Sequence, residues 1–463
     1  MPTGFFARLS TCAQSAFLLA ALAVFASCRA PQPAPDAEPV GDLREARAYW
    51  LAADAIAWQA PEGSTVSLHF SKSAGLPLTP SSPLRGDQVP LQRDGEVDGG
   101  LAVRFPHLAG LPLFRPGDSS RADLADMLKS QSAVAAVDGA GRLQAATALQ
   151  PAGVLDDLYA YDGDLGVVFR GDTPHIRLWA PTARSVKLHL FDDSDPAVPA
   201  SAVLPMAWDD STGTWSIAGE PGWNRKYYLF EVEVYVRRTG RIEQNFVTDP
   251  YSLGLAMDSR RSQVVNLADA DLQPEDWESL PKPPLEQPED IVLYELHVRD
   301  FSIADLTVPE PERGTFAAFR YPGTHGMRHL TGLADAGLTH VHLLPVFDCA
   351  TIPENPDDQL SPPDLAGYAP DSKRQQEEVG KVRARDAFNW CYDPYHYTVP
   401  EGSYAMDPDG VARILEFREM VSSLNRYGLR VVMDVVYNHT TTAGQAEKSV
   451  LDRIVPDYYQ RLD

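Results

Sequence analysis

The hydrophobic pattern of this chain changes at the proline-rich segment 280–288, and that change limits the possible folds more than any other property. Before the segment, apolar residues mostly alternate with polar ones, as in strands that bury one face. After it, nearly continuous apolar runs at 291–298, 341–346 and 430–437 are separated by stretches with helical or loop character. Such runs are typical of parallel strands that are covered on both faces. The chain is therefore predicted to join β-rich modules to an α/β domain.

Two β-rich modules are predicted before that segment. The first, residues 42–150, contains alternating stretches at 66–70 and 101–108, which we interpret as strands. The second, residues 151–285, has period-two apolar spacing between turns of Pro, Gly and Asp, and we expect an immunoglobulin-like β-sandwich there. Its tryptophans allow two interpretations, core packing or ligand stacking, and packing is favoured because large aromatic side chains are usually buried. They are Trp179, Trp208, Trp215 and Trp223.

Residues 286–463 contain the three apolar runs, and we interpret them as the first three βα units of an incomplete (β/α)8 TIM barrel. A doubly wound sheet is the alternative. No glycine-rich phosphate loop follows any of the runs, which disfavours nucleotide binding. Because a barrel of this kind needs eight strands, we expect an open sheet edge and an uncovered apolar face in this part of the chain.

The composition limits the partners of the protein. The chain has 463 residues, and its 44% hydrophobic content is sufficient for more than one buried core. Lys and Arg number 40 against 64 Asp and Glu, which leaves a formal charge of -24. A basic footprint for nucleic acid or an anionic membrane surface is therefore not expected, and an uncharged partner fits better.

Residues 1–28 have the features of a signal peptide, because Arg8 precedes an apolar run at 16–26 that is too short for a permanent membrane helix. Small residues lead into Cys28, as in bacterial lipoprotein signals, where that cysteine is lipidated. A plain secretory peptide is the alternative. We expect an outer-membrane lipoprotein at the cell surface or in the periplasm, or otherwise a secreted protein, with membrane contact only through a lipid anchor. Residues 29–41 are rich in Pro and Ala and are predicted to be a flexible linker.

Two cysteines, Cys349 and Cys391, lie outside the predicted targeting segment. Cys349 follows the second predicted strand and Cys391 lies in an aromatic stretch, so both are expected at one rim of the barrel. A disulfide between them suits an oxidising compartment. Two separate buried thiols are the alternative.

Aromatic, acidic and imidazole side chains follow the second and third predicted strands. Trp390, Tyr392 and Asp393 belong to the loop after the second strand, and Asp434 and His439 to the end of the third. Because the C-terminal ends of barrel strands share one face, we expect these groups to line one pocket. An aromatic ring can stack on the apolar face of a sugar while carboxylate and imidazole groups bind its hydroxyls. Taken alone, Asp434 suits a loop cap and His439 a packing role, but the combination favours a binding site.

Several stretches resemble a known enzyme family. Residues 434–439, Asp-Val-Val-Tyr-Asn-His, are similar to the first catalytic-region motif of glycoside hydrolase family 13. Residues 388–394, Phe-Asn-Trp-Cys-Tyr-Asp-Pro, resemble the Tyr-Asn-Trp-Gly-Tyr-Asp-Pro signature of type I pullulanases. Stretches 294–300 and 395–404 are similar to the same enzymes, and 177–182 resembles carbohydrate-binding module family 48. The chain is most similar to the multi-module, lipoprotein-type pullulanases of Gram-negative bacteria.

The resemblance implies hydrolysis of α-1,6-glucosidic linkages with retention of configuration. The expected partners are α-glucans, namely pullulan, amylopectin, glycogen and limit dextrins, and no cofactor is expected to be required. It further implies that 42–150 is a pullulanase N-terminal module and that 151–285 is a carbohydrate-binding module of family 48. Family enzymes take their aspartate nucleophile and glutamate acid/base from later strands. Both are therefore expected beyond Asp463, and no catalytic residue is assigned within the chain.

Carried over residue by residue, the resemblance assigns roles to the strand-end groups. Tyr392 is expected to be the stacking platform for the cleaved glucosyl unit. Asp434 is expected to orient the surroundings of the nucleophile, and His439 to bind the primary hydroxyl of the same sugar. Asn438 matches a position that ligates calcium in many amylases, so calcium is the one metal expected.

Two positions of the 388–394 stretch depart from the family signature. Phe388 stands where the family has tyrosine, which removes a hydroxyl. Cys391 stands where the family has glycine, which adds a side chain where the family leaves room. The local backbone or the wall of the substrate site is therefore expected to differ.

Three functions are compatible with these features. The favoured one is an exported debranching hydrolase, truncated before its nucleophile and acid/base, so that this fragment alone is inactive. The alternative is a non-catalytic secreted α-glucan-binding protein. A debranching enzyme of the isoamylase type is the third, and the 388–394 signature argues against it.

Overall fold

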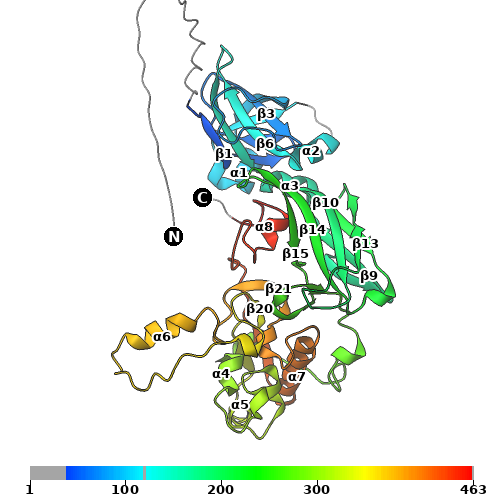
Figure 1. Ribbon diagram of the computed structural model, residues 1–463, viewed down its shortest axis with the longest axis vertical. Coiled ribbons are helices and arrows are strands. Elements are labelled where there is room, and N and C mark those ends of the chain that lie inside the picture. The colour runs from blue at the N-terminus through cyan, green and yellow to red at the C-terminus, as the bar shows by residue number, and fades with distance from the viewer. Residues whose placement is uncertain (1–37, 118–120, 461–463) are drawn as a thin grey trace, which may run out of the picture. The chain divides into compact units, whose positions relative to one another are not determined.

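The computed structural model describes residues 38–117 and 121–460 (Figure 1). The predicted signal peptide 1–28, the Cys28 lipidation site and nearly all of the linker 29–41 lie outside the described residues. Within the part that is described, no helix combines the length and the apolar character needed to cross a membrane.

A closed β-barrel forms the first module. Its strands are β1 (Gly41–Ala52), β2 (Ala55–Ala57), β3 (Thr65–Ser71), β4 (Asp87–Glu96), β5 (Pro112–Pro116), β6 (Gln131–Val137) and β7 (Leu143–Gln150). They follow the order β1-β2-β5-β4-β3-β6-β7, and the parallel pairing of β1 with β7 closes the barrel (Figure 1). Ile56, Leu68 and Val134 are fully buried in the core.

Short helices connect the barrel strands. They are α1 (Gly99–Arg104), α2 (Arg121–Leu128), α3 (Ala152–Tyr159) and the 3-10 turn η1 (Pro106–Leu108). The strand predicted at 101–108 is wrong, because α1 and η1 occupy these residues. The N–H of Phe105 donates to the carbonyl of Leu101 at 2.8 Å and closes a helical turn. Pro106 has no N–H to offer a strand ladder, so the apolar alternation here does not lead to pairing.

The second module is built from two antiparallel sheets that share one core. Its strands are β8 (Gly166–Arg170), β9 (Thr173–Trp179), β10 (Ala183–Phe191), β11 (Ala202–Pro205), β12 (Ala207–Asp209), β13 (Thr214–Ala218), β14 (Tyr227–Val236), β15 (Arg241–Val247), β16 (Gly254–Leu255) and β17 (Ser262–Gln263). One sheet has the order β11-β10-β14-β17-β16, with β15 also paired to β14, and the other the order β12-β13-β9-β8. Ile176 and Leu188 come from opposite sheets and are both fully buried. This is the arrangement of a β-sandwich.

Three of the four tryptophans pack inside this module. Trp179, Trp215 and Trp223 are buried, and the first two donate their ring N–H to backbone carbonyls at 2.9 and 3.1 Å. Trp208 packs on the core edge, and the ammonium of Lys129 lies 3.6 Å from its ring centre. The packing interpretation is therefore confirmed for the three buried rings, while Trp208 joins the sandwich to the first module.

A three-stranded parallel sheet begins the third part of the chain. Its strands are β18 (Leu293–Leu296), β19 (His340–Leu343) and β22 (Arg430–Met433), in that order. Tyr294, Val341 and Val431 lie opposite one another across it. The antiparallel pair β20 (Phe347–Cys349) and β21 (Pro394–Pro400) lies at the C-terminal side of β19. The sheet is open among the described residues, which do not include a closed (β/α)8 barrel.

Helices cover this parallel sheet. They are α4 (Val298–Ser302), α5 (His325–Asp335) and α7 (Ala412–Arg426). The hydroxyl of Thr324 caps α5 by accepting the N–H of Met327 at 3.4 Å, and Met327 and Leu330 are fully buried. From α7, Met420 and Leu424 are fully buried in the same core. Apolar residues at helical spacing thus place both helices against the sheet.

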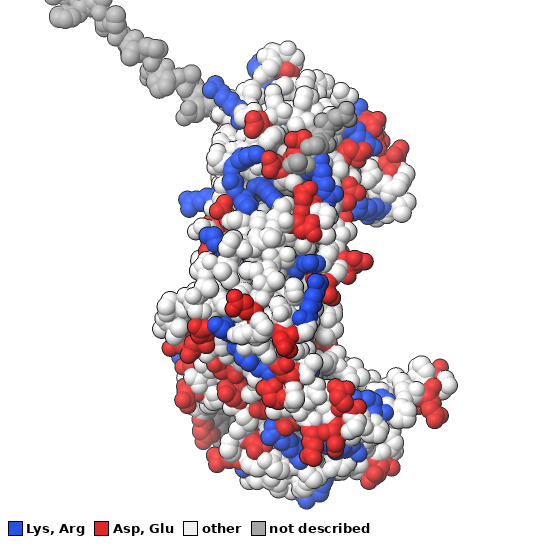
Figure 2. All heavy atoms as spheres, turned by 90° about the vertical axis from the view of Figure 1, so that its right-hand side faces the viewer, with Lys and Arg blue, Asp and Glu red and all other residues white. Residues whose placement is uncertain are grey.

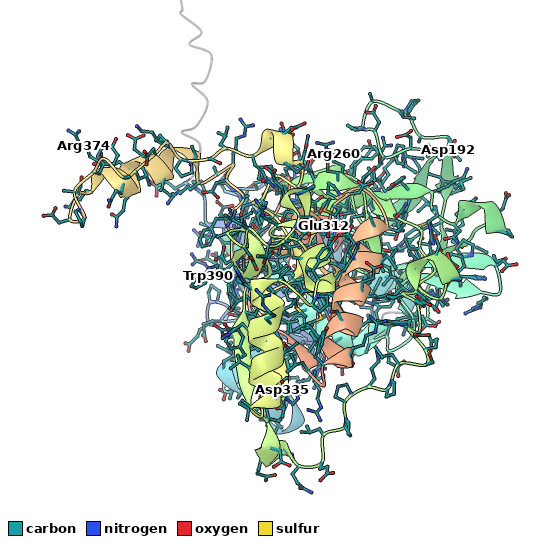
Figure 3. All side chains as sticks on the ribbon, turned by 90° about the horizontal axis from the view of Figure 1, so that it is seen from below. Asp192, Arg260, Glu312, Asp335, Arg374 and Trp390 are labelled. Carbon is teal, nitrogen blue, oxygen red and sulfur yellow. A yellow bond between two sulfur atoms is a disulfide. The ribbon has the colours of Figure 1, made fainter. Side chains whose placement is uncertain are left out.

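The remaining elements are short. They are α6 (Arg374–Val382), α8 (Leu451–Ile454), η2 (Pro221–Trp223), η3 (Met257–Ser259), η4 (Ala270–Leu272), η5 (Pro288–Asp290), η6 (Glu310–Glu312), η7 (Phe316–Arg320), η8 (Pro356–Asp358) and η9 (Gly402–Tyr404). α6 lies on the long loop between β20 and β21, and Figure 3 shows Arg374 far out on that loop.

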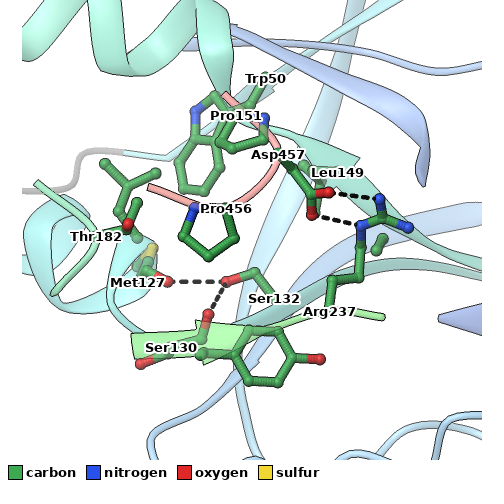
Figure 4. Close-up of a pocket in the computed structure, with 13 residues that line it drawn as sticks. Trp50, Met127, Ser130, Ser132, Leu149, Pro151, Thr182, Arg237, Pro456 and Asp457 are labelled. Carbon is green, nitrogen blue, oxygen red and sulfur yellow. Dashed lines mark hydrogen bonds and ion pairs between the residues drawn. The ribbon is translucent and has the colours of Figure 1, made fainter. Parts of the chain in front are cut away.

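The segment that carries α8 packs against both N-terminal modules. Asp457 accepts two hydrogen bonds from the guanidinium of Arg237, at 2.8 and 2.9 Å, and both side chains are largely buried (Figure 4). The ring of Tyr458 lies 4.7 Å from that of Trp179. A small cavity of about 70 Å³ separates this segment from Trp50 and Thr182. The ion pair therefore joins the end of β14 to the segment after α8.

Charged side chains are mixed on the surface. On the face in Figure 2, Lys and Arg side chains lie among Asp and Glu side chains.

Candidate functional site

The loop 388–394 meets the end of β22 above the parallel sheet. The phenol of Tyr392 donates a hydrogen bond of 2.6 Å to Oδ2 of Asp434. Asp434 immediately follows β22, and Tyr392 precedes β21 by two residues. Two segments more than forty residues apart are thereby joined at the C-terminal ends of the strands, as the barrel interpretation predicts.

His439 belongs to the same group. Its Nε2–H donates to the backbone carbonyl of Tyr392 at 2.7 Å. The side-chain amide nitrogen of Asn438 lies 2.9 Å from its Nδ1, so both ring nitrogens have partners. Asp434 and His439 therefore both hold Tyr392, one through the phenol and one through the backbone.

The protonation of Tyr392 is strongly favoured. The hydrogen bond to Asp434, together with partial burial and the negative charge of Asp434, raises the pKa of Tyr392 to about 12. The phenol is therefore a hydrogen-bond donor at any physiological pH. Tyr392 is 39% exposed, so part of the residue is accessible to a ligand.

The other two predicted residues of the loop behave differently. Trp390, which Figure 3 labels, is 54% exposed. Asp393 accepts hydrogen bonds from Thr351 at 2.5 Å and from the side chain of Asn389 at 3.0 Å. The carboxylate of Asp393 thus stabilises the loop, and its predicted contact with a ligand stays a prediction.

Two residues that sequence reasoning missed support the loop from beneath. His297 accepts the N–H of Asp300 on Nδ1 at 3.3 Å and donates from Nε2 to the carbonyl of Asn389 at 2.9 Å. The hydroxyl of Tyr404 lies 3.0 Å from the same Nε2, and burial raises the pKa of Tyr404 far above its usual range. Both residues lie in stretches that resemble pullulanases, and that resemblance was the signal available for finding them.

The two cysteines outside the targeting segment are joined. Cys349, at the end of β20, and Cys391, in the loop, form a disulfide with a Cα–Cα distance of 5.2 Å. Both are buried, whereas the neighbours of Cys391 on either side, Trp390 and Tyr392, are exposed. The loop is therefore anchored inward at its central residue.

A buried polar network lies below the loop. The guanidinium of Arg413 contacts Glu354 at 2.9 Å and Asp348 at 3.8 Å, and Asp348 contacts His396 at 2.6 Å. Glu401 accepts two backbone N–H groups at 2.7 and 2.9 Å. Burial, with the neighbouring charge of Asp348, raises the pKa of Glu401 to about 7.

This network resembles a metal site in its ligands but contains its own cation. Oxygens of Asp348, Glu354 and Glu401 lie close enough together to hold an ion. Arg413 already occupies the position of the positive charge, so a structural role is favoured. Calcium binding at Asn438 stays a prediction.

Two family models match the N-terminal part of the chain. The Pullulanase N2 domain model matches residues 45–157, and the model of carbohydrate-binding module 48 (isoamylase N-terminal domain) matches residues 164–252. The chain is 40% identical over 436 residues to pullulanase 1, chloroplastic, of Arabidopsis thaliana, which covers 92% of this chain and 45% of that protein. The chain belongs to the pullulanase family. The aromatic loop and the end of β22 are thus parts of a pullulanase-family chain.

Solved structures are similar over the same length. Ligand-free PulA from Klebsiella pneumoniae has a TM-score of 0.84 and 35% identity, covering 90% of this chain and 43% of that one. Klebsiella pneumoniae pullulanase complexed with maltotriose has a TM-score of 0.85 and 34% identity, covering 91% and 44%. This pullulanase-family chain therefore spans less than half the length of these relatives.

Proposed function

We propose that this pullulanase-family chain is part of a debranching hydrolase that cleaves α-1,6-glucosidic linkages in starch, glycogen or pullulan, with retention of configuration. The observation that carries the proposal is the 2.6 Å hydrogen bond from Tyr392 to Asp434. It holds an exposed aromatic ring and a carboxylate at the strand ends, where α/β barrels place their chemistry. The maltotriose complex of the Klebsiella relative supports an α-glucan as the ligand.

The side chains of this site suit a neutral sugar. The exposed part of Tyr392 offers an apolar surface to a pyranose ring. Asp434 keeps lone pairs that can accept sugar hydroxyls beside the phenol, because each carboxylate oxygen accepts more than one hydrogen bond. His439 is held in place by contacts of its two ring nitrogens with Asn438 and with the backbone of Tyr392.

A retaining mechanism requires a carboxylate nucleophile and a carboxylic acid about 5 Å apart. We assign neither role to a described residue. We propose that later βα units of an α/β barrel supply both groups and cover the exposed edge of β22. The open sheet supports this proposal, since a parallel edge with exposed Met433 and Val435 is unfavourable in water.

A non-catalytic α-glucan-binding protein is the second candidate. The match to carbohydrate-binding module 48 over residues 164–252 supports it, and neither a nucleophile nor an acid/base is assigned among the described residues. Both candidate functions require binding of an α-glucan, and only the hydrolase also cleaves it.

The test combines binding and turnover on the purified chain. Migration through a gel containing pullulan reports binding, and release of reducing ends reports hydrolysis. We expect Tyr392→Ala to abolish the retardation, because it removes the platform. Phe246→Ala should leave it unchanged, because Phe246 lies on β15 and is 48% exposed, against 39% for Tyr392. Binding that survives Tyr392→Ala would contradict this site. Hydrolysis by the 463-residue chain would contradict the absence of an assigned nucleophile.

Two further properties are proposed on the sequence alone. Export directed by residues 1–28 is one, with lipidation of Cys28 as the favoured form and plain secretion as the alternative. Calcium at Asn438 is another, and removal by EDTA with a measured loss of thermal stability would test it. The mass of the N-terminal peptide from the native host would decide between lipidated and cleaved forms.

A further inference from the structure

The disulfide that ties loop 388–394, called the aromatic loop, to β20 supports an inference beyond the family resemblance. We propose that the bond between Cys349 and Cys391 is the clamp that positions Trp390 and Tyr392 for ligand contact. Its effect on glucan affinity rests on the proposed function. Its effect on the loop itself does not.

The backbone of Cys391 explains why a clamp is needed. Its φ is +58°, in the left-handed region that favours glycine and that other residues adopt at a cost. The pullulanase signature has glycine at this position, which adopts such a backbone without penalty. In this chain a cysteine occupies it, and the covalent bond to Cys349 compensates for the lost freedom. The disulfide therefore stabilises the left-handed backbone at position 391, which glycine adopts without such a bond.

The disulfide fixes the loop at a residue that lies between two exposed aromatic side chains. Cys391 is fully buried, and its N–H donates to the side chain of Asn389 at 2.8 Å. The residues on either side, Trp390 and Tyr392, point outward and are the two exposed rings of the site. Fixing the inward residue therefore fixes the directions of both exposed neighbours.

The other end of the bond is rigid. Cys349 ends β20, lies opposite Pro394 in the β20–β21 pair, and is 4% exposed. Its N–H donates to Glu401 at 2.7 Å. The bond also closes a loop of 42 residues that contains α6, so it holds both ends of this long excursion together.

The other ties on the loop are hydrogen bonds. Asn389 is held by Thr351 and by His297, and Asp393 by Thr351. Tyr392 is also held by Asp434 and by His439. A hydrogen bond can open and re-form, whereas the disulfide is covalent and shielded from thiol exchange by burial. The clamp is therefore expected to be permanent in the folded protein, not a rapidly cycling switch.

The experiment measures hydrogen exchange of the peptide around 386–394 in the whole chain. TCEP breaks the S–S bond, each sulfur gains a hydrogen, and the phosphine becomes its oxide with the oxygen of water. We expect exchange about tenfold faster in the reduced wild type, since a left-handed residue without its tie favours local opening. Unchanged exchange with two titratable thiols would overturn the proposal.

Three variants separate the bond from the backbone. Cys391→Gly loses the bond and keeps a residue suited to the left-handed conformation, so its exchange should stay close to wild type and ignore TCEP. Cys391→Ala and Cys349→Ser lose the bond and retain a side chain at position 391, so both should exchange about as fast as the reduced wild type. Equal exchange in Cys391→Gly and Cys391→Ala would contradict the backbone argument. If Cys349→Ser fails to fold by circular dichroism, Cys391→Gly and reduction of the folded wild type still decide.

Retardation in a pullulan gel separates this inference from the proposed function. Weaker retardation in Cys391→Ala than in Cys391→Gly supports the clamp as a determinant of affinity. Faster exchange without pullulan binding in any form supports the clamp on the loop and overturns the glucan site. Normal binding that TCEP and Cys391→Ala both leave unchanged overturns the clamp and leaves the glucan site standing.

Discussion

Single side chains decide the chemistry at the strand ends. Tyr392 is held through its phenol by Asp434 and through its carbonyl by His439, at 2.6 and 2.7 Å. A ring fixed at two points loses little freedom when a ligand binds, so more of the contact energy is available for affinity. The contributions of the ring and of the hydroxyl can be separated by mutation.

Replacing Tyr392 with Phe keeps the ring and removes the donor to Asp434. We expect maltotriose to bind about 3- to 10-fold more weakly, because a hydrogen bond of this kind contributes about 1 kcal/mol. Isothermal titration calorimetry would measure it. In a double-mutant cycle, Asp434→Ala should add little to Tyr392→Phe, and full additivity would show that the two side chains do not act together.

The buried Glu401 predicts how stability depends on pH. Its pKa rises from about 4.3 in an unfolded chain to about 7 in the fold. Between these values the folded protein holds a proton that the unfolded chain has released. The stabilisation is therefore complete below about pH 4 and is lost as pH rises through 7.

We expect the free energy of unfolding to fall by on the order of 2 kcal/mol between pH 5 and pH 8. Urea titrations at several pH values would measure it. Glu401→Gln should reduce this slope without abolishing it, because burial also raises the pKa of Glu416 to about 7. A stability that increases over this range would refute the assignment.

Helices and strands of the third part depend on one core. Met420 of α7 and Leu330 of α5 are fully buried against the parallel sheet. The sheet is short, four residues in each strand, so helix packing supplies most of its stability. The exposed edge at β22 adds nothing to that core.

Met420→Ala should therefore destabilise the third part by about 2–5 kcal/mol, since it removes buried methylene groups and leaves a cavity. Met406→Ala is the matched control, because Met406 is 43% exposed, and it should change stability by less than about 0.5 kcal/mol. Urea unfolding followed by near-ultraviolet circular dichroism would compare the two. Equal effects would indicate that α7 does not pack as described.

Across the whole described chain, the segment after α8 links the modules. The buried pair of Arg237 and Asp457 joins it to β14, and Tyr458 packs on Trp179 of the sandwich. A buried charge that loses its partner is much more costly than a surface charge. The stability lost when this pair is broken therefore measures how much the segment after α8 and the β-sandwich stabilise each other.

Asp457→Asn should lower the stability by about 3 kcal/mol, because it leaves the guanidinium of Arg237 buried without a countercharge. Asn also tolerates the positive φ of 62° at this position, so the backbone is not perturbed. Asp42→Asn, which breaks an exposed pair with Arg44, should change it by less than about 1 kcal/mol. Differential scanning calorimetry would measure both, and similar effects would show that the buried pair is dispensable.

Much of the architecture was readable from local pattern. The apolar runs before residue 300, at 341–346 and at 430–437 became β18, β19 and β22, and the period-two stretches became the sandwich strands β9, β10 and β14. The strand predicted at 101–108 was wrong, because alternation of apolar residues alone does not reveal that Pro106 interrupts strand pairing. The parallel closure of β1 on β7 had no local signal, since it joins residues about one hundred apart.

The sequence by itself selected Tyr392, Asp434 and His439 as candidate site residues, through strand-end position and family resemblance, and the structure brings the three together. Only the tertiary structure decided that the two cysteines pair, that Asp393 is engaged within the loop, and that His297 supports it from beneath. The physical reason is that periodicity records whether a side chain is buried, which is a local property. The partner of each side chain depends on packing between segments far apart in the chain, and no local pattern records it.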